Sequence, residues 1–358
     1  MKKTLILIAV LFSSSLFATR ADFIAREFCQ KDSRLKKNYC LEMMEFAYRS
    51  PFPKKGTVLL IPGFFQNVNI WHLDPEKGVS VARYLMEKFG LHPFVLHVRG
   101  IGHSDYVKDS NMDDIAIDDI PRAIDELSTL SGGPIYVMGH SQGAITAAAS
   151  LSGLTRCGKK NCFKPEVAEL RQSKVKKLAM LAGNLAMSID REDNFLLPLM
   201  KLADSKILRS TLRAIDEIDV KLVTSLTGPV AFLNYWENLY LLENAPDDSR
   251  RALWKKSVDT SSAEIVIQFA EGIENRNIQC VGGTAYSKGA ENLKLPVVQQ
   301  TYDQDELAEW EATRRDTFEH IGSQNKKFLL VKNRAHEDFF MNKNLHSDLD
   351  SVVEFLYQ

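Results

Sequence analysis

Residues 139–143, Gly-His-Ser-Gln-Gly, constrain this chain more than any other segment. The apolar residues before them, 134–138, predict a short buried strand, and the small residues after them, 144–149, predict a helix. A strand, a sharp turn and a helix are the context in which a Gly-x-Ser-x-Gly motif lifts its serine above the edge of a sheet. The segment therefore predicts Ser141 as a nucleophile.

The composition is that of an ordinary globular protein with enough material for a full core. Of the 358 residues, 45% are hydrophobic and 25% are charged, and the formal net charge is −1. A charge this close to zero, with scattered Lys and Arg, provides no field that would attract nucleic acid or an anionic membrane. We therefore expect no nucleic-acid partner.

The N-terminus, residues 1–18, resembles a secretory signal peptide. Lys2 and Lys3 precede an apolar stretch over residues 5–16, and Ala18 or Ala21 offers a small residue for cleavage. The stretch is shorter than the ~20 residues that a membrane span needs. No other segment is long and apolar enough, so we expect an exported protein, periplasmic or secreted, with no transmembrane segment in the mature chain.

The five cysteines agree with export, because disulfides persist in oxidising compartments. Cys29 and Cys40 lie close together in sequence, and so do Cys157 and Cys162. We expect each pair to close a short loop, with Cys280 left as a buried thiol. The alternative for the second pair is half of a metal site, but no other His/Cys cluster accompanies it.

The apolar runs predict an α/β protein with a mostly parallel sheet and helices on both faces. Continuous apolar runs are typical of strands covered on both faces. The predicted strands cover residues 57–61, 94–98, 135–138, 177–182, 296–298 and 327–331. Helical spacing connects them over residues 79–89, 115–130, 307–321 and 349–356. Residues 22–50 are interpreted as a lead-in with a short helix.

The alternation stops between residues 186 and 293, where helical patterns replace strand patterns. Five such patterns cover residues 196–202, 207–215, 220–226, 232–242 and 265–273. We interpret this stretch as a helical cap inserted between two parts of the core, residues 19–185 and 294–358. Its aromatic residues are expected to form mainly the core of the cap, with one or two lining a ligand cavity.

A serine nucleophile needs a base and an acid, which in this strand order follow as Ser, then Asp or Glu, then His. His336 comes directly after the last predicted strand and is the candidate base among eight histidines. His346 and His320 are expected at the surface. The loop after the preceding strand holds Asp305 and Asp303, and we favour Asp305 as the acid that orients the imidazole.

The developing oxyanion would need backbone N–H donors. The amide of Gln142, directly after the nucleophile, is one candidate. The loop after the first core strand, residues 62–67, supplies the other, and we choose the amide of Phe64 because Gly63 allows a tight path.

These segments together resemble the α/β-hydrolase superfamily, and within it the acid-lipase-like branch. The similarity lies in residues 62–67 with Trp71, in residues 99–104, in residues 118–125, in the elbow itself and in His336-Glu337-Asp338-Phe339. Pro62 departs from the family's His-Gly pair, and Gln299 and Gln300 are polar where that strand is usually apolar. The resemblance implies ester hydrolysis, often of lipids, beneath a mobile cap, with no cofactor or metal.

The sequence thus predicts a serine hydrolase of carboxylic esters, with lipid or other apolar acyl esters as substrates and a transient contact of the cap with lipid surfaces. Because the triad alone does not select the leaving group, a thioesterase, an amidase or a polyester depolymerase remains an alternative. A binding protein that keeps the fold without catalysis is a third.

Overall fold

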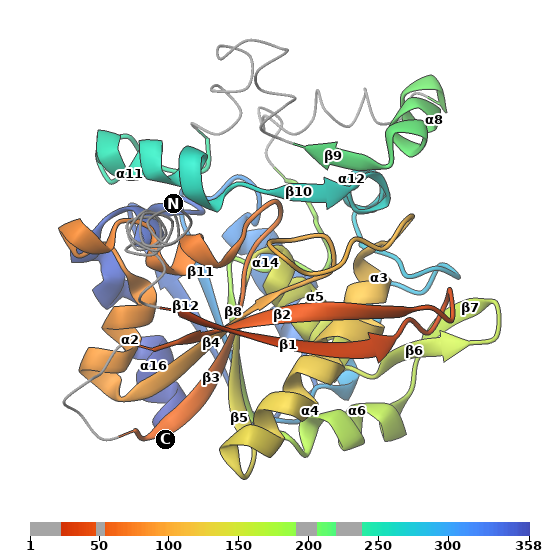
Figure 1. The fold of residues 1–358 in the computed structure, drawn as a ribbon, viewed down its shortest axis with the longest axis horizontal. Coiled ribbons are helices and arrows are strands. Elements are labelled where there is room, and N and C mark those ends of the chain that lie inside the picture. Colours follow the sequence, from red (N-terminus) through yellow and green to blue (C-terminus); the bar gives the residue numbers. More distant parts are fainter. Residues whose placement is uncertain (1–22, 48–53, 191–205, 220–237) are drawn as a thin grey trace, which may run out of the picture.

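An eight-stranded sheet organises the chain (Figure 1). The computed structural model describes residues 23–47, 54–190, 206–219 and 238–358. The strand order is β1-β2-β4-β3-β5-β8-β11-β12, in which β1, β2 and β4 pair antiparallel and all other neighbours pair parallel. The strands are β1 (Phe23–Lys31), β2 (Asn38–Phe46), β3 (Gly56–Ile61), β4 (Leu91–His97), β5 (Ile135–His140), β8 (Val175–Leu181), β11 (Val297–Tyr302) and β12 (Lys326–Val331).

Helices cover both faces of this sheet, which confirms the predicted fold class. Those outside the insertion are α2 (Val81–Phe89), α3 (Met112–Asp114), α4 (Ile120–Ser131), α5 (Gln142–Leu151), α6 (Pro165–Gln172), α14 (Trp310–Asp316), α15 (Asp338–Met341) and α16 (Asp350–Tyr357). Shorter 3-10 turns are η1 (Val68–His72), η2 (Pro75–Lys77), η6 (Phe318–His320) and η7 (Lys343–Leu349), and η3 (Ile115–Asp119) is a wider π-type turn that leads into α4.

The core consists of two layers, because successive strand side chains point to opposite faces. Leu59 and Ile61 of β3 pack in one layer, together with α4 and α5. Val58 and Leu60 of the same strand pack in the other layer, with α2 and α16. This arrangement accounts for the continuous apolar runs that the sequence shows in the parallel strands.

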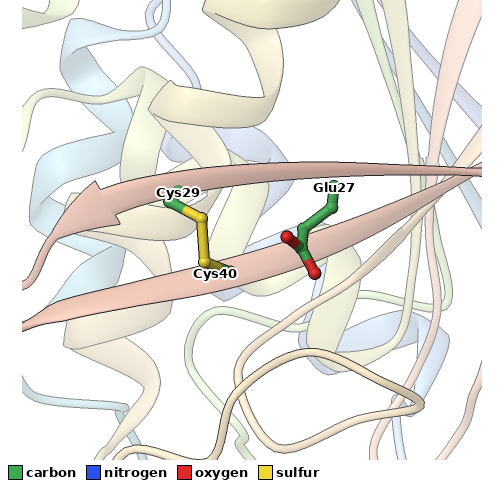
Figure 2. A group of neighbouring side chains, drawn as sticks. All are labelled: Glu27, Cys29 and Cys40. Atoms are coloured by element: carbon green, nitrogen blue, oxygen red, sulfur yellow. A yellow bond between two sulfur atoms is a disulfide. The ribbon is translucent and has the colours of Figure 1, made fainter.

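The prediction for residues 22–50 is wrong: β1 and β2 form an antiparallel hairpin at the edge of the sheet, not a helix. Strand β1 is largely exposed, so it shows no apolar run, and its ladder of hydrogen bonds to β2 is a tertiary feature. Cys29 and Cys40 lie directly opposite each other in this hairpin and form the predicted disulfide (Figure 2).

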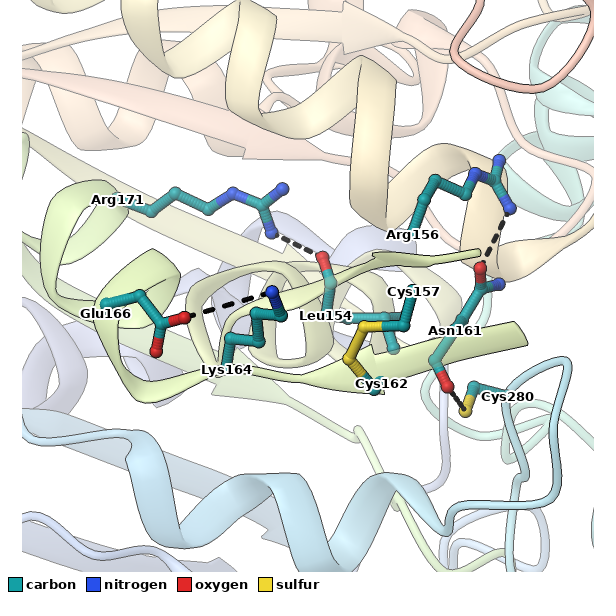
Figure 3. Close-up of a disulfide and its surroundings, with 9 residues drawn as sticks. All are labelled: Leu154, Arg156, Cys157, Asn161, Cys162, Lys164, Glu166, Arg171 and Cys280. Carbon is teal, nitrogen blue, oxygen red and sulfur yellow. Dashed lines mark hydrogen bonds and ion pairs between the residues drawn. A yellow bond between two sulfur atoms is a disulfide. The ribbon is translucent and has the colours of Figure 1, made fainter. Parts of the chain in front are cut away.

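The second predicted disulfide, Cys157–Cys162, closes another hairpin, between β6 (Leu154–Cys157) and β7 (Lys160–Phe163). Cys280 is a free, buried thiol, as expected, and its Sγ lies 3.3 Å from the carbonyl oxygen of Asn161 (Figure 3). The sequence predicted the pairing but not the hairpin, because its two strands are only four residues long.

The inserted stretch contains helices and also a small two-stranded sheet that the sequence did not predict. Figure 1 shows its elements α8, β9, β10 and α11 together above the main sheet. The described elements are α8 (Lys206–Ile215), β9 (Glu217–Asp219), α11 (Asp247–Ala252), η4 (Leu253–Ser257), β10 (Thr260–Ser262), α12 (Ala263–Glu274), α13 (Tyr286–Gly289) and η5 (Ala290–Asn292).

Other predictions for this stretch fall partly outside the described residues. The helical patterns at 196–202 and 220–226 lie there entirely, and so do residues 232–237 of the fourth pattern. Residues 238–242, the rest of that pattern, form turns instead of a helix. Within the parts of the chain that the structure describes, no helix combines the length and apolar character that crossing a membrane requires.

Two further expectations are corrected. The helix predicted over residues 307–321 spans only Trp310–Asp316, because Asp305 draws the amides of Leu307 and Ala308 into a tight turn instead. His346, expected at the surface, is buried, and burial lowers its pKa to about 4. His320 is exposed, as expected.

A buried arginine, Arg99, joins the edge hairpin to the body of the sheet. Its guanidinium donates to the carboxylate of Asp119 and, at 2.8 Å, to Asp32 Oδ2 at the end of β1. It also donates to the hydroxyl of Tyr39 at 2.7 Å. The side chains of Arg99 and Asp119 are fully buried. Removing one partner of such a network strands the other charges in the interior.

We therefore expect Arg99→Met to lower the free energy of unfolding by about 3–5 kcal/mol, because Asp119 and Asp32 lose their counter-charge. Arg122→Met is the matched control: Arg122 forms an exposed i,i+4 pair with Glu126 and should change stability by at most ~0.5 kcal/mol. Urea denaturation of both variants tests this, and equal effects would contradict a structural role for the buried network.

Candidate active site

The elbow at Ser141 lies where β5 ends and α5 begins. Ser141 has φ 52° and ψ −121°, a backbone conformation that side-chain-bearing residues rarely adopt. Its amide donates to the carbonyl of Leu181 in β8 at 2.8 Å. The strand–turn–helix context that the motif required is therefore present, and the strain is held by hydrogen bonding to the neighbouring strand.

Gly143 is required by close packing rather than by its own φ angle. A Cβ at Gly143 would lie 2.3 Å from the carbonyl oxygen of Ile61 and 2.5 Å from that of Pro62. Only a glycine at position 143 therefore allows helix α5 to approach the end of β3 this closely. This contact brings the elbow and the loop after β3 together.

His336 and Asp305 form a buried pair at the same edge of the sheet. His336 Nδ1 lies 2.8 Å from Asp305 Oδ2, and both side chains are almost inaccessible. A carboxylate only accepts, so Nδ1 carries the hydrogen and Nε2 is left as the acceptor. Burial alone would lower the pKa of His336, but the adjacent Asp305 carboxylate outweighs it and raises that pKa.

Of the two candidate acids, the structure joins only Asp305 to His336. Asp305 Oδ1 also accepts the amides of Leu307 and Ala308, which hold the carboxylate in place. Asp303 instead accepts the Arg334 amide at 3.3 Å. Among the described residues, no hydrogen bond leaves the Ser141 hydroxyl; catalytic hydrogen bonds often tighten only when substrate is bound.

The loop after β3 brings its backbone to the elbow. The Gly63 amide donates to Gln66 Oε1 at 3.0 Å, and the Gln66 amide returns to the Gly63 carbonyl at 3.3 Å. Because Gly63 is engaged in this way, the amide of Phe64 is the next donor along the loop. Gln142 is the first residue of α5, so its amide has no acceptor within the helix.

Two residues that sequence reasoning left without a role lie beneath this loop. Glu337 is fully buried, and its Oε1 accepts from Gln66 Nε2 at 2.6 Å. His140 Nε2 donates to the His336 carbonyl at 3.1 Å, and the two imidazole rings lie 4.7 Å apart. Glu337 lies within the motif at residues 336–339 that the sequence had singled out. Nothing in the sequence indicated that Gln66 is its partner.

Burial raises the pKa of the Glu337 carboxyl to about 7, against the opposing effects of His336 and Gln66. Within the described part of the chain, its Oε2 has no hydrogen-bond partner, and neither has His140 Nδ1. A carboxyl group without a counter-charge in the interior keeps its proton more readily than one in water.

The inserted stretch is hydrogen-bonded to both loops of the candidate site. Asp338 accepts the amides of Ala335 and Leu241, and the Glu337 amide donates to the Leu239 carbonyl. On the other side, the Asp259 amide donates to the Phe65 carbonyl at 2.7 Å. The inserted stretch therefore positions the loops that would carry the base and the oxyanion donor.

Aromatic side chains from the loop after β3 and from α12 form an apolar wall. The rings of Phe64 and Phe65 lie 3.8 Å apart, and Phe269 of α12 lies 5.1 Å from Phe64. Ile265 of α12 and Phe65 also line a small cavity of about 20 Å³ beside Gln142, which has room for a single water molecule. Phe65 and Ile265 thus line the same cavity as Gln142, together with polar residues such as Gln66 and Thr146.

In the described part of the chain, two groups of side chains have the donor types of a metal site. His140, His336 and Glu337 offer atoms within 4.8 Å of one another, but Asp305 and the His336 carbonyl already engage one nitrogen of each ring. Glu27 lies beside Cys29 and Cys40 (Figure 2), whose sulfurs are joined in a disulfide and are not available as thiolates.

Comparison with known proteins matches part of the chain to one family model and most of it to solved structures of similar fold. Residues 56–214 match the sequence model of a family described as the alpha/beta hydrolase fold. The chain is also similar to triacylglycerol lipase 1 of Arabidopsis thaliana, with 31% identity over 157 residues. That alignment covers 40% of this chain and 39% of the plant lipase, so it spans well under half of the relative.

Solved structures extend the likeness of fold to nearly the whole chain. A monoacylglycerol lipase of Paleococcus ferrophilus superposes with a TM-score of 0.55 at 18% identity, covering 88% of this chain and 98% of that one. A monoglyceride lipase of Saccharomyces cerevisiae gives 0.59 at 13% identity, covering 93% and 94%. The match over residues 56–214 and the likeness to these structures together show an α/β-hydrolase fold.

The buried Glu337 makes stability depend on pH. Its folded-state pKa of about 7 exceeds the ordinary 4.5, so between these values the native chain keeps a proton that the unfolded chain releases. The free energy of unfolding therefore falls as pH rises through this window. Glu337→Gln should gain up to about 3 kcal/mol over the wild type between pH 5 and pH 8.

Thermal or urea unfolding at several pH values measures this difference. Glu319→Gln, at an exposed glutamate, is the matched control and should follow the wild-type curve. Parallel pH curves for Glu337→Gln and the wild type would show that the carboxyl ionises normally in the folded state.

Proposed function

We propose that this protein is an exported serine hydrolase that cleaves carboxylic esters with apolar acyl groups. The observation that carries the proposal is the buried Asp305–His336 pair, which lies beside the strained elbow of Ser141. The plant relative and two of the similar structures are named as lipases, which supports a lipase- or esterase-type hydrolase.

In the proposed reaction, the Ser141 hydroxyl attacks the ester carbonyl while His336 Nε2 takes its proton. The amides of Phe64 and Gln142 stabilise the oxyanion, and Asp305 stabilises the imidazolium. Collapse of the tetrahedral intermediate breaks the ester C–O bond, and His336 returns the proton to the departing alcohol. Water then attacks the acyl-enzyme by the same route and releases the acid.

The preference for apolar acyl groups is supported by the aromatic wall of Phe64, Phe65 and Phe269. The cap, which we place at residues 186–293, contributes Phe269 to this wall; it would cover the acyl chain and make transient contact with lipid surfaces. Export is supported by two disulfides and by the signal-like residues 1–18, which lie outside the described residues.

Replacement of the proposed catalytic residues tests the triad. Ser141→Ala should abolish labelling by a fluorophosphonate probe and lower the esterase rate by ~10⁶. Asp305→Asn should lower kcat by ~10⁴, because the imidazole loses its orienting carboxylate. Asp303→Asn is the matched control. Its kcat should stay close to the wild-type value, because Asp303 accepts from the Arg334 amide and not from His336.

Two results would reject this assignment. Wild-type labelling no stronger than that of Ser141→Ala would favour a non-catalytic binding protein with this fold. A larger loss of kcat in Asp303→Asn than in Asp305→Asn would transfer the role of the acid to Asp303.

The acyl preference is tested with p-nitrophenyl esters of increasing chain length. We expect kcat/KM to rise with chain length, because each buried CH₂ lowers the activation free energy by up to ~0.8 kcal/mol. Phe269→Ala should reduce the rate with long esters and leave acetate unaffected, because only a long chain reaches α12. Activity confined to acetate would contradict a lipid substrate, and faster cleavage of matched thioesters or amides would favour those alternatives.

A further inference from the structure

Glu337 is a buried carboxyl group that the proposed triad does not use. It follows His336 directly, and its side chain is only 2% exposed. A buried polar group without partners is costly, so its contacts identify what it contributes. Among the residues that the structure describes, its side chain makes one hydrogen bond, the 2.6 Å contact with Gln66 Nε2.

The Gln66 side chain connects Glu337 to the backbone of Gly63, the residue before Phe64. A carboxyl oxygen at Oε1 accepts from the NH₂ group of Gln66, which turns the Gln66 carbonyl toward the Gly63 amide. Both ends of one amide are therefore used, and its orientation is unambiguous. The Gly63 amide is occupied by Gln66 Oε1, which leaves the Phe64 amide as the next donor along the loop.

This loop lies directly against Ser141. A Cβ at Gly63 would lie 3.3 Å from Ser141 Cβ, 3.0 Å from His140 Nδ1 and 2.8 Å from Gln66 Oε1. Phe65, next to the proposed donor, has φ 59°, which is a constrained conformation for a side-chain-bearing residue. An oxyanion donor acts only when it is held at its final position, so small shifts of this loop should be costly.

We propose that Glu337 is a positioning residue: through Gln66 it fixes the Gly63–Gln66 loop so that the Phe64 amide faces the reacting carbonyl. The inference rests on the proposed serine-hydrolase function. It links the two halves of the site, because the base His336 and the residue that positions the oxyanion loop are neighbours in the chain.

The test uses the full chain, four single variants at Glu337 and Gln66, the double leucine variant and one control variant. Glu337→Leu removes the acceptor, and Gln66→Leu removes the connecting amide. Glu337→Gln keeps an acceptor oxygen, and Gln66→Asn keeps the amide but is too short to reach both Gly63 and Glu337. Gln324→Leu, at an exposed glutamine, is the matched control. Each is assayed on p-nitrophenyl butyrate, with circular dichroism and thermal unfolding to establish folding.

We expect Glu337→Leu, Gln66→Leu and Gln66→Asn to lower kcat by about tenfold or more with KM little changed, less than the ~10²–10³ lost with an oxyanion donor itself. Glu337→Gln should restore most of kcat. Because the two residues act in one chain of contacts, the double leucine variant should be no worse than either single variant. Hydrogen exchange at the Gly63 amide should accelerate in Glu337→Leu and not in Glu337→Gln.

Folded Glu337→Leu and Gln66→Asn proteins with wild-type kcat would overturn the inference, and so would losses confined to KM or losses that multiply in the double variant. If Glu337→Leu fails to fold, Gln66→Asn alone decides between these outcomes. A wild type that neither cleaves the ester nor reacts with a fluorophosphonate would overturn the proposed function and this inference together. An active wild type with insensitive variants would overturn only the inference.

Discussion

The close contact between α5 and the end of β3 is the constraint on which the rest of the site depends. At Gly143 the helix backbone lies so near the carbonyls of Ile61 and Pro62 that a Cβ would overlap them. The same contact places Ser141 beside Gly63 and sets the loop after β3 over the elbow. A parallel sheet makes this possible, because the ends of β3, β5 and β8 lie at one edge.

The opposite side of the site is organised by three consecutive residues. His336 bonds to Asp305, Glu337 to Gln66, and Asp338 to the amide of Leu241 in the inserted stretch. In the proposed enzyme, one short segment therefore connects the base, the oxyanion loop and the cap. Residues 239–241 of the inserted stretch are thus hydrogen-bonded to the segment that directly follows His336.

The sequence predicted those parts of the fold that local patterns encode. All six predicted strands are present, because strands covered on both faces are rich in apolar residues, although β11 also buries Gln299 and Gln300. The edge hairpin was missed for the converse reason: β1 is mostly exposed, and only its pairing with β2 makes it a strand. His346 was misplaced because a polar residue in the short turn η7 does not reveal which side chains will cover it.

Taken by itself, the sequence determined the fold class, the elbow, both disulfide pairings and the candidates Ser141, His336 and Asp305, since each depends on spacing along the chain or on the order of motifs. Only the tertiary structure decided that His336 pairs with Asp305 and not with Asp303, and that Glu337 reaches Gln66. Those contacts join residues 31 and 271 positions apart, and no local pattern records which carboxylate a loop will turn inward. Burial selects these contacts, because a carboxyl group in the interior is costly unless a hydrogen-bond donor lies within reach.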